Sequence, residues 1–251
     1  MLNRLLPVVT TVALLGAWEV LTQTNVLPPE VPPLTEMFRW TIDQPAGDGL
    51  WSSLVETLRH WAWGLVAGVL AGISIGVLIG SVTWARLLLQ GPLEFMRAIP
   101  SVVYLPVLVL VIGATSETVV ILVAVAVCWP MLFQTLYGVQ AIDSLAIETA
   151  RMFGLTQFER FYFVTLRSIL PFLATGMRIA SSLALVVAIS VELIGGVPGL
   201  GYELFLLGQN EIYPGVYSAI FIAGVLGVIL NVGLGKIERR LLRWHVSTRE
   251  A

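Results

Sequence analysis

Residues 61–82 read WAWGLVAGVLAGISIGVLIGSV, a run without a single charged side chain. As a helix this run reaches about 33 Å at about 1.5 Å per residue, and the hydrocarbon core of a bilayer is about 30 Å thick. A glycine recurs at every fourth position, at Gly64, Gly68, Gly72, Gly76 and Gly80. On a helix these glycines form a ridge without side chains, which lets a second helix pack closely. The run therefore predicts a membrane-spanning helix with a packing face.

The rest of the chain has the same apolar character. Of its 251 residues, 57% are hydrophobic and 12% are charged, which is about half the charged fraction of an ordinary soluble domain. The apolar runs are continuous rather than alternating, which favours helices over a transmembrane barrel. We predict an all-α, polytopic membrane protein that forms a single domain, 1–251. Its six transmembrane helices are expected at roughly 5–22, 61–82, 93–113, 118–137, 169–194 and 214–234.

The distribution of Lys and Arg predicts the orientation. With six spans, both termini, the 83–92 loop and the 138–168 loop share one side, whereas the other side has only Arg39 and Arg59. The positive-inside rule places both termini in the cytoplasm. It also makes 23–60 an outer segment, in which LPPEVPPLTEMFRW leads into a short interfacial helix. The basic residues on or near the inner side are Arg4, Arg86, Arg97, Arg151, Arg160, Arg167, Lys236, Arg239, Arg240, Arg243 and Arg249.

Residues 148–163, ETARMFGLTQFERFYF, place four charges between two long apolar runs. Asp143 or Ser144 is a suitable N-cap for a short helix, and Gly154 is suited to end it. The Thr-x-x-Glu pattern at 156–159 is a capping box that begins a second helix. The sequence therefore predicts a folded elbow of two helices on the cytoplasmic side.

The first helix of the elbow combines charged and apolar side chains. Apolar side chains on a water-facing loop usually need a partner surface, and a helix lying on the bilayer is the alternative. The side chains concerned are Ile147, Ala150, Met152 and Phe153, together with Glu148 and Arg151.

The elbow resembles the E-A-A-x3-G-x9-I-x-L-P loop of permease subunits of bacterial ABC importers. Glu148, Ala150 and Gly154 match this motif, whereas Thr149 replaces an alanine and Arg167 replaces the proline. Further stretches resemble the subfamily that imports nitrate, taurine and aliphatic sulfonates. These are MRAIPSVVYLPVLVL at 96–110, GMRIASSLALVVAISVELIGG at 176–196 and PGLGYEL at 198–204.

The resemblance implies a type I ABC importer permease, in which the 138–168 loop contains the coupling helix that docks on an ATP-binding subunit. It also implies two ATP-binding subunits that hold ATP and Mg²⁺, a second copy of this chain, and an extracytoplasmic solute-binding protein. The location implied is the lipid of a bacterial inner membrane. The residues expected to couple to the ATPase are Glu148, Thr149, Ala150, Arg151, Phe153 and Gly154.

The chain itself is not expected to be an enzyme. It has no Gly-x4-Gly-Lys-Ser/Thr stretch, the loop that holds nucleotide phosphates, so ATP hydrolysis must come from partners. We expect no cofactor or metal in this chain and no nucleic-acid partner.

Two charged residues lie inside the predicted spans. Arg178 and Glu192 are about 21 Å apart along one helix, so they cannot pair with each other there, and intramembrane charges are often functional. Glu192 either lines the mouth of the pathway or satisfies the GGVPGLGY loop, and His60 is expected to be interfacial. The pathway or gate candidates are Glu192, Arg178, Ser190, Ser74, Tyr104 and Gln134.

These observations predict the permease subunit of an ATP-driven importer for a small anionic solute of the sulfonate or nitrate kind. The alternative is a stand-alone secondary transporter or channel. That class needs protonatable or ion-binding groups deep in the spans and broken helices arranged as repeats.

Overall fold

The computed structural model describes residues 2–24, 26–45 and 49–242, and within them the chain forms helices and turns without a strand. The all-α prediction is therefore confirmed. The elements in chain order are α1 (Leu2–Gln23), α2 (Leu34–Asp43), α3 (Leu50–Gly80), α4 (Thr83–Arg97), the 3-10 helix η1 (Ser101–Tyr104), α5 (Leu105–Ile112), α6 (Ser116–Gln140), α7 (Ser144–Met152), α8 (Gln157–Arg160), the π-helical turn η2 (Phe161–Thr165), α9 (Leu166–Gly195), α10 (Leu200–Gln209) and α11 (Tyr213–Leu241).

Within the described residues, four helical segments are long and apolar enough to cross a membrane. They contain the spans predicted at 118–137, 169–194 and 214–234, and Leu50–Gly80 covers the span predicted at 61–82 except for residues 81–82, so all four are confirmed as helices of spanning length. The count rises to five if the bent pair of α4 with η1 and α5 forms one span. Within the described residues α1 is not among these segments, so the count of six is not confirmed. The segments are Leu50–Gly80, Ser116–Gln140, Gln157–Gly195 and Tyr213–Arg240.

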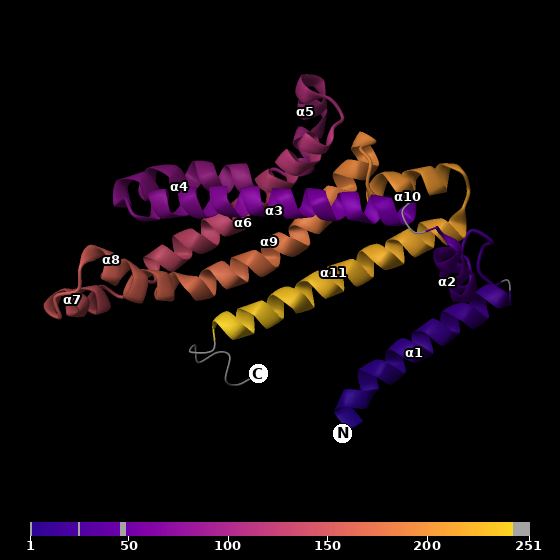
Figure 1. Ribbon diagram of the computed structural model, residues 1–251, viewed down its shortest axis with the longest axis horizontal. Coiled ribbons are helices and arrows are strands. Elements are labelled where there is room, and N and C mark those ends of the chain that lie inside the picture. The colour runs from indigo at the N-terminus through magenta and orange to yellow at the C-terminus, as the bar shows by residue number, and fades with distance from the viewer. Residues whose placement is uncertain (1, 25, 46–48, 243–251) are drawn as a thin grey trace.

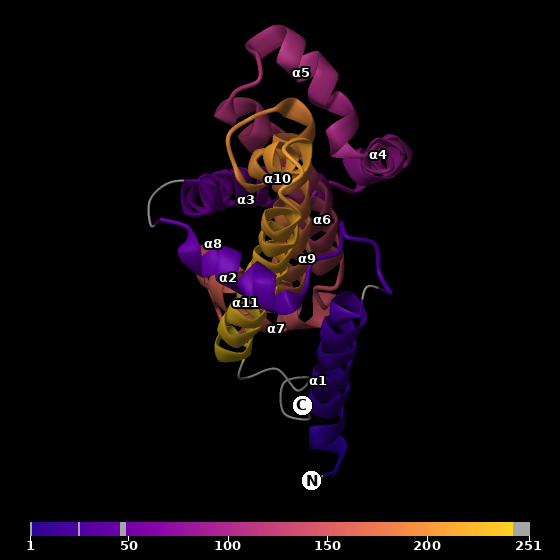
Figure 2. The same ribbon diagram turned by 90° about the vertical axis from the view of Figure 1, so that its right-hand side faces the viewer.

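The region between α3 and α6 differs from the prediction. The expected loop at 83–92 is helical, because α4 begins at Thr83, and the span expected at 93–113 is broken near its start. The two helical parts meet at 79°, so α5 points away from the other long helices (Figures 1 and 2). Pro100 explains the break, since proline has no N–H to donate and disfavours helical geometry in the residue before it.

The core of the bundle lies where α3 packs on α6 and α6 packs on α9. All five glycines of the ridge face α6. A Cβ atom added at Gly64 would lie 2.4 Å from a methyl group of Val123, and one at Gly72 would lie 2.6 Å from the Cys128 carbonyl oxygen. Contacts this short do not occur between real side chains, so the close approach of α3 to α6 requires glycine at these positions.

Shorter helices gather at the end of the bundle where α3 begins. There α2 and α10 pack beside α11, and the Ser218 hydroxyl of α11 donates a hydrogen bond to the Met37 carbonyl of α2 at 2.9 Å. A carboxylate oxygen of Glu19 in α1 accepts a hydrogen bond from Leu34 N–H at 2.7 Å. The Trp18 ring of α1 also contacts Tyr217 of α11, whereas the N-terminal part of α1 stands apart from the bundle (Figures 1 and 2).

The segment at 23–60 is helical in two places. It contains all of α2 and the first residues of α3, up to His60. That α2 lies at the membrane interface stays a prediction. Of the basic residues predicted on the cytoplasmic side, Arg243 and Arg249 lie outside the described residues.

Candidate functional site

The elbow lies at the end of the bundle opposite α2 and α10 (Figure 1). The Asp143 carboxylate accepts a hydrogen bond from Leu145 N–H at 2.9 Å, so Asp143 is the N-cap of α7. At the start of α8, the Glu159 carboxylate accepts from Thr156 N–H at 2.8 Å, and the Thr156 hydroxyl accepts from Glu159 N–H at 3.3 Å. The predicted capping box is confirmed. Both helices of the elbow therefore begin at fixed residues.

Gly154 makes the turn between the two helices. Its φ is +72°, in the left-handed region that favours glycine. Gly154 N–H donates to the Arg151 carbonyl at 2.9 Å, and Leu155 N–H donates to the Ala150 carbonyl at 3.1 Å, as at a common helix C-terminus. Apart from its chain neighbours, no described part of the chain lies within 4 Å of the Cβ position of Gly154. The turn therefore needs glycine for its backbone geometry and not for space.

Apolar side chains of the elbow lie on its surface. Met152 is 88% exposed, and Phe153 and Phe158 are each 78% exposed. Glu148, Thr149 and Arg151 are exposed as well, whereas Ala150 is buried. An ordered surface with three large exposed apolar groups is suited to contact another protein.

The chain leaves the elbow as a continuous helix, although Arg167 replaces the proline of the motif. The π-helical turn Phe161–Thr165 joins α8 to α9. The Arg167 guanidinium lies 5.6 Å from the ring centroid of Phe163, within the range of a cation–π contact. The segment that leads out of the elbow is therefore helical, and α9 directly continues α8.

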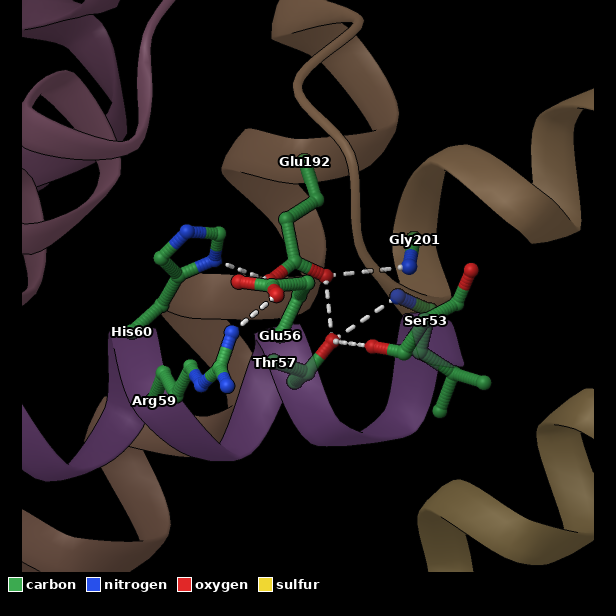
Figure 3. A network of polar contacts seen from close by, with 8 residues as sticks. Ser53, Glu56, Thr57, Arg59, His60, Glu192 and Gly201 are labelled. Atoms are coloured by element: carbon green, nitrogen blue, oxygen red, sulfur yellow. Dashed lines mark hydrogen bonds and ion pairs between the residues drawn. The ribbon is translucent and has the colours of Figure 1, made fainter. Parts of the chain in front are cut away.

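A buried polar cluster lies at the other end of the bundle (Figure 3). Glu192 of α9 has no exposed surface. One of its carboxylate oxygens is 2.8 Å from Nδ1 of His60, and the other accepts from the Thr57 hydroxyl at 2.8 Å and from Gly201 N–H at 3.1 Å. The Thr57 hydroxyl also accepts from Leu200 N–H at 2.8 Å. The cluster therefore joins α3, α9 and the start of α10.

Two glycines let the backbone pass close to Glu192. A Cβ atom at Gly199 would lie 2.3 Å from the carboxylate carbon of Glu192, and one at Gly201 would lie 2.1 Å from the Ile189 carbonyl oxygen. Glu192 thus satisfies the loop before α10, which is one of the two roles expected from the sequence. The other role is not supported, because the buried carboxylate faces donors of its own chain.

His60 is buried inside the bundle, and its expected position at the membrane interface stays a prediction. The side chain is 2% exposed, and Nε2 has no hydrogen-bond partner within the described part of the chain. Its partner Glu192 lies 132 residues further along the sequence. Nothing in the sequence around His60 indicates this pairing, since local patterns do not show which helices meet.

A cavity of about 450 Å³ lies between α6, α9 and the break after α4. Most of its walls are apolar. Gln134, one of the six pathway candidates, lines it together with Arg97 and Ser101. Sequence reasoning assigned Arg97 to the start of a span and missed its place in this cavity. The other lining residues are Ile99, Pro100, Val102, Ala126, Trp129, Pro130, Phe133, Tyr137, Ile179, Leu183 and Val187.

The remaining pathway candidates lie elsewhere. Arg178 forms an ion pair with Glu238 that joins α9 to α11. The Ser190 hydroxyl donates to the Val186 carbonyl of its own helix at 2.7 Å. Tyr104 packs against the core, and Ser74 lies exposed on α3.

Comparison with known proteins gives consistent results. Residues 64–243 match the family model described as binding-protein-dependent transport system inner membrane component. The taurine transport system permease protein TauC of Escherichia coli (strain K12) is 29% identical over 91% of this chain and 85% of its own length. The nitrate import permease protein NrtB of Leptolyngbya laminosa is 25% identical over 91% of this chain and 84% of its own length.

The fold is also similar to solved structures. One is an inward-facing conformation of the MetNI methionine ABC transporter, with a TM-score of 0.59 and 18% sequence identity. The similarity covers 76% of this chain and 94% of the solved one. At this identity the match supports the fold alone.

Proposed function

The chain belongs to the family of binding-protein-dependent transport system inner membrane components, and from this membership we propose its role in detail. It is a multi-pass membrane protein and the permease subunit of an ATP-driven importer, not an enzyme. ATP-binding subunits and a solute-binding protein are the partners that the family implies. The path of the chain from the elbow to the cavity supports a more specific mechanism.

The ordered elbow is the observation that supports this mechanism. Its two helices are capped, and its exposed Met152, Phe153 and Phe158 provide an apolar contact surface. We infer that an ATP-binding subunit covers this surface. Because α8 continues into α9, a movement of the elbow would be transmitted along α9 to the cavity at its side. Rigid-body movement of this kind is a common way for a protein to change state, and here it would open the pathway alternately to the two sides of the membrane.

The assembly proposed contains two copies of this chain and two ATP-binding subunits, which hold ATP and Mg²⁺ and lie on the cytoplasmic side with the elbow. Both termini then lie in the cytoplasm, as the positive charges predict, and lipid of a bacterial inner membrane surrounds the helices. The exposed apolar side chains of α5, including Val107 and Leu110, support a contact with the second copy. A solute-binding protein would dock at the end formed by α2 and α10.

The solute proposed is a small oxyanion. Taurine and nitrate appear in the names of two relatives. In both compounds the negative charge is spread over oxygen atoms bonded to a central sulfur or nitrogen. The alternative of a stand-alone secondary transporter or channel has no support from the charges inside the spans. Glu192 and Arg178 are each paired with groups of their own chain.

The test of the docking surface uses Phe153→Ser in the complete complex reconstituted in liposomes. We expect retention of the ATP-binding subunit during purification and ATP-driven uptake both to fall by about tenfold, because loss of one buried aromatic contact at an interface costs about 1–2 kcal/mol or more. Uptake of nitrate and of taurine, ATP hydrolysis and subunit stoichiometry are measured together.

Ile42→Ser is the matched control. Ile42 is 79% exposed on α2, at the end of the molecule away from the elbow. The control should keep the ATP-binding subunit during purification, which is the property compared, because α2 belongs to the end proposed for the solute-binding protein. Normal uptake with Phe153→Ser would show that the ATP-binding subunit docks elsewhere.

A further inference from the structure

We propose that Arg97, with Gln134 and Ser101, forms the site at which the transported oxyanion rests inside the membrane. The proposal rests on the function proposed above and names the side chains that recognise the solute.

Arg97 is the last residue of α4, immediately before the break. It is fourteen residues, or about 21 Å, from the start of that helix. Its guanidinium lies 4.7 Å from the ring centroid of Phe133 in α6, a cation–π arrangement in which the ring supports one face of the cation. The break at Pro100 ends the helix beside the cavity, so the cation lies at the wall of an apolar chamber.

The charge of Arg97 is not neutralised by the chain itself. Within the described residues no carboxylate oxygen lies at ion-pair distance from its guanidinium, in contrast to Arg178 and Arg59. A charge inside a membrane segment is costly, and such residues usually face a cavity or serve a function. Arg97 is exposed and lines the cavity without an acidic partner among the described residues, so its guanidinium is available to bind an anion.

The chemistry of the three side chains fits an oxyanion. The planar guanidinium offers parallel N–H groups that match two oxygens of one anion, which a lysine cannot do. The stem of Gln134 packs close to Gly176 of α9, where a Cβ atom would lie 3.1 Å from the Gln134 Cβ. Gln134 and Ser101 line the same cavity and supply an amide and a hydroxyl that can donate to remaining oxygens.

The first experiment measures uptake by the complete complex in liposomes, with its ATP-binding subunits and a saturating amount of its solute-binding protein. The probes are nitrate, taurine and ethanesulfonate. Arg97→Gln should lower uptake of the transported probe by about tenfold, since a bidentate charged hydrogen bond is lost. Arg97→Lys should lower it less, because the charge stays. The subunit content of both variant complexes should match that of the unmodified complex.

The control is Arg86→Gln, which removes a cation from the same helix away from this cavity. Its uptake should match that of the unmodified complex. If the unmodified complex transports none of the three probes, the proposed solute class is wrong. If it transports a probe and Arg97→Gln transports that probe equally well, the site proposed here is wrong and the function stands.

A second experiment keeps Arg97 and so does not depend on how its variants fold. Gln134→Cys is introduced in a Cys128→Ala background, and the new thiol is exposed to anionic and cationic methanethiosulfonates. Each rate is divided by the rate of that reagent with a free thiol in solution. The anionic reagent should react several-fold faster, and added nitrate should slow it, because Arg97 attracts anions. An equal or greater rate for the cationic reagent would overturn the proposal.

Discussion

The two ends of the helical bundle differ in which groups they bury and which they expose. At the end formed by α2 and α10, the Glu192 cluster is closed: the carboxylate is buried and accepts hydrogen bonds from groups of its own chain (Figure 3). At the elbow, backbone groups are satisfied by caps, whereas large apolar side chains such as Phe153 lie exposed. The Glu192 cluster is satisfied within the chain itself, whereas the elbow presents large apolar side chains for a partner to cover.

This difference predicts which property each substitution changes. Removal of a group from the closed cluster leaves buried polar atoms without partners, which lowers the free energy of unfolding. A change on the exposed elbow removes few contacts within the chain, so it should lower coupling to the ATP-binding subunit with little change in stability.

The largest effect is expected for Glu192→Ala. Thr57 and Gly201 N–H would lose their common acceptor and His60 would lose its partner, and each buried polar group left without a partner costs about 1–3 kcal/mol. The midpoint of thermal unfolding of the detergent-purified subunit should fall accordingly, and the yield of folded protein should fall with it.

Glu56→Ala is the matched control for that measurement. Glu56 pairs with Arg59 one turn before His60 (Figure 3), but both side chains are partly exposed, and such surface pairs contribute below about 1 kcal/mol. Equal loss of stability in the two variants would show that the closed cluster has no special role.

A smaller effect is expected for Gly72→Leu, in the ridge between the two ends. The added side chain would meet the Cys128 carbonyl and the Met131 side chain of α6, and overpacking of this kind costs up to about 3 kcal/mol. Stability and assembly should both fall. Gly233→Leu on α11 is the control, because no described residue outside the adjoining helix backbone lies within 4 Å of the Cβ position there. A stable, active Gly72→Leu complex would show that α3 and α6 need no close approach.

The sequence predicted local features of this fold better than contacts between distant segments. The glycine ridge, the caps of the elbow and four long helices depend on short-range patterns, and these were found. The break at Pro100 was missed because the apolar run continues through it and hides the change in direction. The partners of Glu192 and the cavity beside Arg97 were missed because each joins segments far apart in the chain, and hydrophobic periodicity does not specify which helices meet.

At the elbow, Gly154→Val should affect coupling more than stability. The left-handed backbone at Gly154 is unfavourable for a β-branched residue by about 1–2 kcal/mol, so the turn should rearrange. We expect uptake and stimulated ATP hydrolysis to fall by about tenfold, with an unchanged midpoint of thermal unfolding. Gly154→Asn is the control, because asparagine tolerates this conformation better. A large loss of stability with Gly154→Val would mean that the elbow is part of the closed core.

The smallest effect is expected for Thr156→Ala, which removes the capping hydroxyl of α8 and leaves the exposed surface unchanged. Loss of an N-cap costs about 1 kcal/mol, and a change of this size alters the ratio of ordered to disordered elbow by about fivefold. Uptake should therefore fall by at most that factor, and Thr156→Ser, which keeps the hydroxyl, should restore it. Glu159→Gln should also be tolerated, because glutamine can replace glutamate in a capping box. If Thr156→Ser were as defective as Thr156→Ala, the methyl group and not the cap would determine coupling, and the order of the elbow would not be what the ATP-binding subunit requires.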